Sequence, residues 1–125
     1  MGGNADACQS TTATQPTVTP NMCPAGWRLP TGASGGELQT LNNAVNFGST
    51  PPTADAGLLS DWLNVYAGDY AGAGGLANQG SFGTYWSSTV NSATNAYYAH
   101  LTNTAVAPGT GAIQKVYGFS LRCVR

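Results

Sequence analysis

Two of the three cysteines enclose most of this chain, and this constrains its fold more than any other feature. The cysteines are Cys8, Cys23 and Cys123. Their spacing fits no zinc site, because there is no Cys-x-x-Cys pair and His100 is the single histidine. A disulfide from Cys23 to Cys123 would close a loop of about 100 residues, which in the entropic model stabilises the fold by roughly 4 to 5 kcal/mol. We therefore predict this disulfide and leave Cys8 outside it, with a short Cys8–Cys23 loop as the alternative.

Charged residues are scarce, at 7% of the 125 residues against a typical value of about 25%. Ion-pair networks are therefore not a major stabiliser of the fold. The 4 Lys and Arg residues are too few for a basic stripe along a phosphate backbone, which excludes nucleic acid as a partner. A chain of this length forms one domain and buries roughly two thirds of its unfolded surface.

A disulfide in a charge-poor domain is typical of proteins outside the reducing cytoplasm. We therefore expect an extracytoplasmic location, secreted or on the cell surface, although no signal-peptide core precedes Cys8. No apolar run approaches the roughly 18 to 20 residues that cross a bilayer. We expect no membrane insertion by this segment.

Composition divides the chain into a lead-in, residues 1–22, and a packed domain, residues 23–125. The lead-in is rich in Thr, Gln, Pro and Ala and has no helical or strand period. After Gly36, apolar residues follow helical spacing as far as Phe47. A second short helix is expected over 56–63, continued by either helix or strand over 64–70. Too few apolar side chains stand between Gly68 and Gly83 for a regular element, so we predict a long ordered loop there.

The chain becomes β-rich after Gly83. Residues 85–89 have strand composition, and residues 97–102 alternate between a more apolar set and a more polar set. We predict that Tyr97, Ala99 and Leu101 face the core and that Tyr98, His100 and Thr102 face outward. Val106 repeats this pattern between two alanines. We predict a turn over residues 108–111 and a closing strand over residues 118–124. The predicted fold class is α+β, with one or two short helices, a small twisted antiparallel sheet and much irregular loop.

Four short motifs occur in an order and spacing that resemble one known family. They are Cys-Pro-Ala-Gly-Trp-Arg-Leu-Pro-Thr at 23–31, Gly-Glu-Leu at 36–38, Gly-Ser-Phe-Gly-Thr-Tyr-Trp-Ser-Ser-Thr at 80–89 and Gly-Phe-Ser-Leu-Arg-Cys-Val at 118–124. Over residues 23–125 the chain resembles the FISUMP-type major paralogous domain. This family resembles a branch of the C-type-lectin fold, and many members resemble the variable proteins of diversity-generating retroelements. The resemblance implies a C-type-lectin-like scaffold with a hypervariable C-terminal surface.

The resemblance also implies which residues bind the ligand. In such systems adenines in Asn codons are replaced, which can produce Tyr, His, Thr, Ala, Val or Ile but not Lys or Gln. Gln114 and Lys115 are therefore expected to be fixed framework. We expect the variable, ligand-binding residues to lie exposed and adjacent, and they are Tyr98, His100, Thr102, Asn103, Ala105, Ala107, Thr110, Ala112, Ile113, Val116 and Tyr117.

The function implied is that of a receptor or adhesin-type variable protein, binding an unknown protein or glycan at a surface, without enzymatic activity or cofactor. The alternative is an invariant cell-surface adhesin or structural domain of the same fold. An enzyme of the formylglycine-generating type ranks last, because its active cysteines and metal ligands have no counterparts here. The calcium-binding signatures of sugar-binding C-type lectins, Glu-Pro-Asn and Trp-Asn-Asp, are also absent.

Structural roles are expected for most other conspicuous residues. Large aromatic side chains dominate burial in small domains, so Trp27 and Trp86 are predicted to anchor the core. His100 is expected to be a contact residue rather than a metal ligand, since a second histidine is missing. Structural hydrogen bonds are predicted for Arg28, Glu37 and Arg122, and helix caps or turns for Asp55, Asp61 and Asp69, which match no EF-hand.

Overall fold

The computed structural model describes residues 22–45, 65–102 and 105–125. Its elements in chain order are α1 (Glu37–Val45), β1 (Asp69–Tyr70), β2 (Leu76–Ala77), β3 (Phe82–Val90), β4 (Asn95–Thr102) and β5 (Val106–Gln114). The strands form a two-stranded sheet, β1-β2, and a three-stranded sheet, β3-β4-β5, and all these pairs are antiparallel. The prediction of an α+β domain with a short helix and small antiparallel sheets is confirmed.

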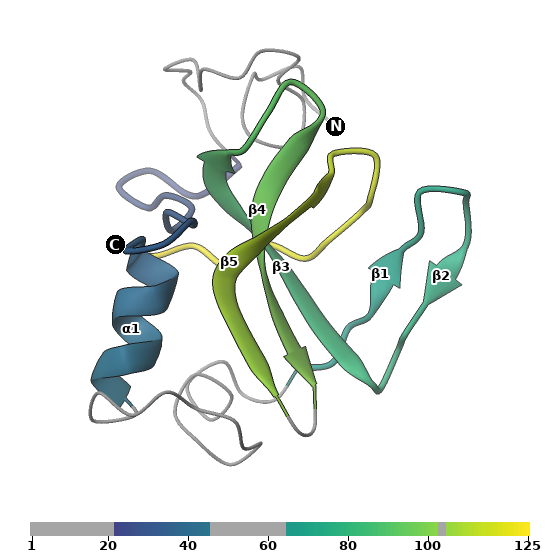
Figure 1. The fold of residues 1–125 in the computed structure, drawn as a ribbon, viewed down its shortest axis with the longest axis horizontal. Coiled ribbons are helices and arrows are strands. Elements are labelled where there is room, and N and C mark those ends of the chain that lie inside the picture. The colour runs from purple at the N-terminus through teal and green to yellow at the C-terminus, as the bar shows by residue number, and fades with distance from the viewer. Residues whose placement is uncertain (1–21, 46–64, 103–104) are drawn as a thin grey trace.

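The three-stranded sheet lies in the middle of the described part of the chain, with α1 on the side of β5 and the β1-β2 hairpin on the side of β3 (Figure 1). The register sets Tyr85 opposite Ala99, and Trp86 opposite Tyr98. Because side chains alternate along a strand, Tyr85 and Trp86 point to opposite faces. Each face of this sheet therefore receives its own large aromatic residue.

The face toward α1 carries the inner cluster, a set of buried residues that lie at most 5% exposed. Leu38 of the helix packs there against β3 and β4, at 1% exposure. Leu38 and Leu41 are three residues apart, which places both on the same side of α1. The inner cluster consists of Leu38, Tyr85, Ala99 and Leu101, with Leu41, Tyr66 and Val106 partly buried against it. Ala99 and Leu101 are buried as predicted, whereas Tyr97 and Val106 are half-buried.

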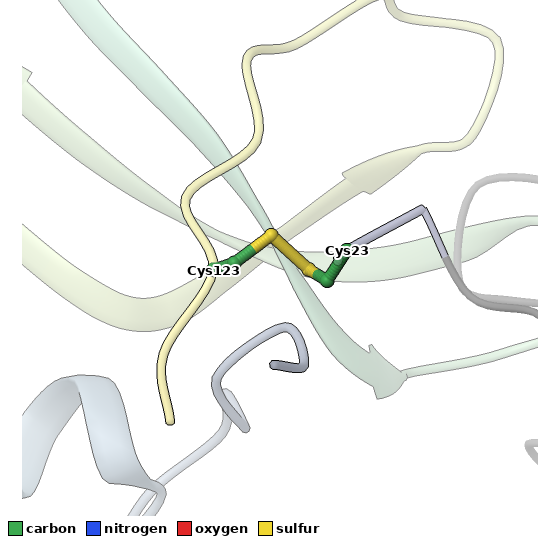
Figure 2. The surroundings of a disulfide bond; sticks show 2 residues. All are labelled: Cys23 and Cys123. Atoms are coloured by element: carbon green, nitrogen blue, oxygen red, sulfur yellow. A yellow bond between two sulfur atoms is a disulfide. The ribbon is translucent and has the colours of Figure 1, made fainter. Parts of the chain in front are cut away.

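The predicted disulfide joins Cys23 to Cys123, with the two Cα atoms 5.8 Å apart and a sequence separation of 100 (Figure 2). Backbone hydrogen bonds continue this connection, since Arg28 N donates to Val124 O (2.9 Å) and Val124 N donates to Arg28 O (2.7 Å). The two ends of the domain are therefore held side by side. Cys8 lies outside the described residues.

A bidentate ion pair fastens the first segment of the domain to α1. Arg28 Nη1 donates to Glu37 Oε2 (2.6 Å), Arg28 Nη2 donates to the other carboxylate oxygen, and Thr31 N donates to Glu37 Oε2 (2.9 Å). The guanidinium hydrogen bond is the main cause that lowers the pKa of Glu37 to about 2. Arg28 and Glu37 thus have the structural role predicted for them.

Two predictions about the β-rich region are wrong in detail. Residues 108–111, predicted as a turn, belong to β5, where the register shifts between Tyr98 and His100. Gly109 adopts a φ of 78° there, so a bulge in an edge strand accommodates the Pro-Gly pair. Residues 118–124 form isolated bridges rather than a strand, because Gly118, Ser120 and Val124 each pair with a different segment.

Two further predictions need correction. The loop predicted over 68–83 contains the β1-β2 hairpin, whose ladder is formed by backbone groups and needs few apolar side chains. Trp27 is not a core anchor, since it is 42% exposed and stands at the end of a turn closed by its hydrogen bond to Pro24. Trp86, at 2% exposure, is the core anchor predicted. The second helix, expected over 56–63, lies outside the described residues.

Candidate functional site

The side of the sheet away from α1 carries a continuous set of rings, which we call the aromatic face. Strand alternation aims Phe82 and Trp86 of β3, and Tyr98 and His100 of β4, to this side. The segment after β5 adds two more rings from outside the sheet. The aromatic face is defined as Phe82, Trp86, Tyr98, His100, Tyr117 and Phe119.

Trp86 is the buried base of the aromatic face. Phe119 stacks on it with ring centroids 4.6 Å apart, and Tyr98 meets it edge-on at 6.4 Å. Tyr98 also lies 5.1 Å from Phe119, and Tyr117 lies 5.8 Å from Phe119. All but Trp86 are partly exposed, so the rings present apolar area to solvent on a fixed support.

His100 extends the row of rings along β4. Its ring lies 6.2 Å from Tyr98 and meets Phe82 edge-on at 4.7 Å. Burial lowers the pKa of His100 below its ordinary value of 6.5, and the charge of Asp69 only partly opposes this effect. His100 is therefore uncharged at neutral pH.

The β1-β2 hairpin lies against the aromatic face through backbone contacts on both sides of Asp69. Before it, Gly68 N donates to Phe82 O (2.9 Å) and Thr84 Oγ1 donates to Gly68 O (2.8 Å). After it, Tyr70 and Gly118 exchange two backbone hydrogen bonds, of 2.8 and 3.0 Å. Asp69 is thus fixed between the segments that carry Phe82 and Phe119.

A side-chain hydrogen bond orients the Asp69 carboxylate, because Asn78 Nδ2 donates to Asp69 Oδ1 (2.7 Å). The carboxylate acts on the aromatic face, where its charge adds to burial in raising the pKa of Tyr98. Asp69 was assigned to a cap or turn from the sequence. Its relation to the rings depends on long-range pairing that no local pattern reports.

Only part of the predicted variable set gathers on the aromatic face. Tyr98 and His100 belong to it, Thr102 lies on the same side of the sheet, and all three are half-buried rather than fully exposed. On β5, Ala107 pairs with His100 and Ile113 with Ala96, which places both on the same side. The segment after β5 contributes Tyr117.

The remaining predicted residues lie elsewhere. Ala112 pairs with Tyr97 and therefore faces the other side of the sheet, and Thr110 stands exposed in the bulge of β5. Ala105 is exposed before β5, and Val116 is 66% exposed beside Gly72 of the hairpin. Asn103 lies outside the described residues. Sequence reasoning missed Phe82 and Phe119 as members of the face.

Residues 22–45, 65–102 and 105–125 contain no group of three or more His, Cys, Asp and Glu side chains placed to hold a metal ion. Nor does any helix within these ranges have the length and hydropathy to span a membrane. Comparisons of the chain with protein-family models, with curated proteins and with solved structures find no match.

Proposed function

We propose that this chain is a non-enzymatic, extracytoplasmic recognition domain with a C-type-lectin-like fold, and that it binds its ligand through the aromatic face. We further propose that its C-terminal region is the diversified part of a variable protein of a diversity-generating retroelement. The motif resemblance over residues 23–125 supports the family, and a small α+β domain closed by a disulfide is compatible with that scaffold.

The observation that carries the binding proposal is the support under the exposed rings. The rings of Tyr98 and Tyr117 both pack against Phe119, which stacks on the buried Trp86. Tyrosine gives a large contact area with a polar tip at low entropy cost, and prior ordering of a binding surface lowers the cost of association. The rings are therefore suited to contact a partner.

Available chemistry favours binding over catalysis. Cys23 and Cys123 are bonded to each other, so neither is a free nucleophile. His100 lies against two aromatic rings, and Asp69, the carboxylate whose charge acts on it, accepts a hydrogen bond from Asn78. The same disulfide supports an extracytoplasmic location, since disulfides persist in oxidising compartments.

Diversification is tested in the genome that encodes the chain. We expect a reverse-transcriptase gene nearby, together with a near-copy of the coding region for residues 85–125 that differs mainly at adenines. A locus without either would contradict diversification and support the invariant adhesin.

Binding capacity is tested by display of two libraries with equal numbers of randomised positions. The first randomises Tyr98, His100, Thr102 and Tyr117, and the matched control randomises four exposed residues on or before α1, Ser34, Thr40, Asn43 and Ala44. Both are selected against lysozyme and albumin as probes. Folded binders from the first library alone are expected, and equal yields would contradict the assignment of the binding surface.

A further inference from the structure

The aromatic face combines ring surfaces with one fixed negative charge. The faces of aromatic rings carry negative electrostatic potential and attract cations within about 6 Å of the ring centroid. Asp69 adds a full charge, and its backbone is fixed on both sides, at Gly68 and at Tyr70. The electrostatic potential of this surface is therefore negative at neutral pH.

Three of the four Lys and Arg side chains interact with groups other than Asp69, and the fourth, Arg125, follows Val124, whose backbone pairs with Arg28. Arg28 pairs with Glu37 at α1, and Lys115 Nζ donates to Ala93 O (3.1 Å) at the connection between β3 and β4. Arg122 acts on Tyr85, which belongs to the inner cluster on the opposite side of the sheet. None of these three contacts compensates the Asp69 carboxylate.

His100 stands between Phe82 and Tyr98 and is the titratable base of the aromatic face. Since burial lowers its pKa, it adds no positive charge at neutral pH. The groups that face it are two rings and, electrostatically, Asp69. A cation that approaches the surface at neutral pH therefore meets π faces and a carboxylate, and His100 adds no charge that opposes it.

We propose that the aromatic face recognises a positively charged side chain, arginine or lysine, on a protein partner, with Asp69 as its counter-charge and Tyr98 and Tyr117 as its ring contacts. This inference rests on the proposed function, since it assigns a ligand class to the same surface. Charge complementarity selects the occupant: a neutral glycan gains the stacking but not the attraction of Asp69.

The test uses two probes of nearly the same shape, N-acetylarginine amide, which carries a guanidinium cation, and N-acetylcitrulline amide, which carries a neutral urea. Each is titrated into the isotopically labelled full chain at neutral pH while the backbone amide resonances are followed by NMR. The arginine probe is expected to shift the amides of Asp69, Tyr98, His100 and Gly118 saturably. We expect it to bind about tenfold more tightly than the citrulline probe.

Matched variants separate the local charge from the net charge. Asp69→Asn retains an acceptor for Asn78 and is expected to weaken arginine binding about tenfold, and Tyr98→Leu to weaken it several-fold. Glu37→Gln removes the same charge from the far side of the sheet and is expected to leave binding unchanged. Amide spectra of the variants establish that each remains folded.

Each other outcome overturns the inference. Equal binding of the citrulline probe, or unchanged binding to Asp69→Asn, would mean that charge does not select the ligand, while the face would stand as a binding surface. Shifts centred away from the face, or no shifts up to the solubility limit, would also refute a cation site. In those cases the proposed function is judged separately by the library and genomic experiments, which do not use these probes.

Discussion

The two faces of the central sheet use the same strands in different ways. On the inner side, α1 covers the inner cluster, and Leu38, Ala99 and Leu101 are at most 2% exposed. On the side of the aromatic face, the described hydrophobic residues that reach that degree of burial are Trp86 and Ala96, and the rings around them stay partly exposed. The inner cluster therefore behaves as a closed core, whereas the aromatic face is a second, half-open layer.

Cover explains the difference between the two faces. Leu38 and Leu41 of α1 pack against the inner cluster, while the aromatic face is covered by the segment after β5 and bordered by the β1-β2 hairpin. Backbone hydrogen bonds, such as those between Tyr70 and Gly118, hold these segments in place without burying the rings under further side chains. A recognition surface needs side chains that are held in place and still exposed to a partner, and the rings of the aromatic face combine both properties.

The largest expected effect tests whether the aromatic face has a core of its own. Trp86→Ala removes the support of both Tyr98 and Phe119 and is expected to lower the free energy of unfolding by about 3 to 5 kcal/mol. Trp86→Phe, which retains an aromatic ring, should cost clearly less. Chemical denaturation measures both variants. A loss under about 1 kcal/mol for Trp86→Ala would break the comparison, because the face would then contribute little to the fold.

A smaller effect compares two glycines of β5 that lie under opposite faces. A Cβ at Gly109 would lie 2.8 Å from Leu38 Cδ1, and the φ of +78° is unfavourable for other residues. A Cβ at Gly111 would lie 3.4 Å from the Tyr98 ring, close to ordinary contact. We expect Gly109→Ala to cost about 2 kcal/mol and Gly111→Ala less than about 0.5 kcal/mol.

Thermal and denaturant unfolding of the two glycine variants checks this difference. Gly111→Ala is the matched control, since the same methyl group is added to the same strand. Equal losses would show that the aromatic face is packed as tightly as the inner cluster. The distinction between a closed and a half-open layer would then fail.

Patterns within a few residues predicted the fold well. The apolar spacing after Gly36 gave α1, and the alternation around Ala99 gave β4 and its buried side. The cysteine spacing led to the disulfide between Cys23 and Cys123. Each of these features depends on residues whose own period or chemistry specifies the outcome.

Features that depend on pairing between distant segments were not predictable. Pro108-Gly109 signals a turn locally, yet pairing with β4 and the contact with Leu38 draw it into β5 as a bulge. No local pattern predicts the position of Asp69 beside the rings, because backbone bonds of its neighbours to Phe82 and Gly118 place it there. The alternation in β4 predicts that Tyr98 and His100 point to the same side of the sheet. Phe82 and Phe119 belong to other segments, so this alternation gives no information on them.

The smallest expected effect concerns the one base on the aromatic face. Because the folded pKa of His100 is lowered below 6.5, the unfolded chain binds more protons than the folded chain as the pH falls below that value. The contribution of His100 to stability is therefore present above 6.5 and is lost as the pH falls through the folded pKa. Because His100 is half-buried and the effect is screened by solvent, we expect a loss below about 0.5 kcal/mol.

Unfolding free energies of the unmodified chain and of His100→Asn, measured from neutral pH down to about 5, isolate this effect. Glu37 does not interfere in that window, since its pKa is lowered from 4.5 to about 2 and its own contribution is lost only in more acidic solution. The difference between the two proteins is expected to narrow as the pH falls, because only the unmodified chain loses the His100 contribution. A difference that stays constant with pH would show that His100 titrates as in the unfolded chain. The aromatic face would then be open to water at its centre, which would sharpen the contrast with the inner cluster.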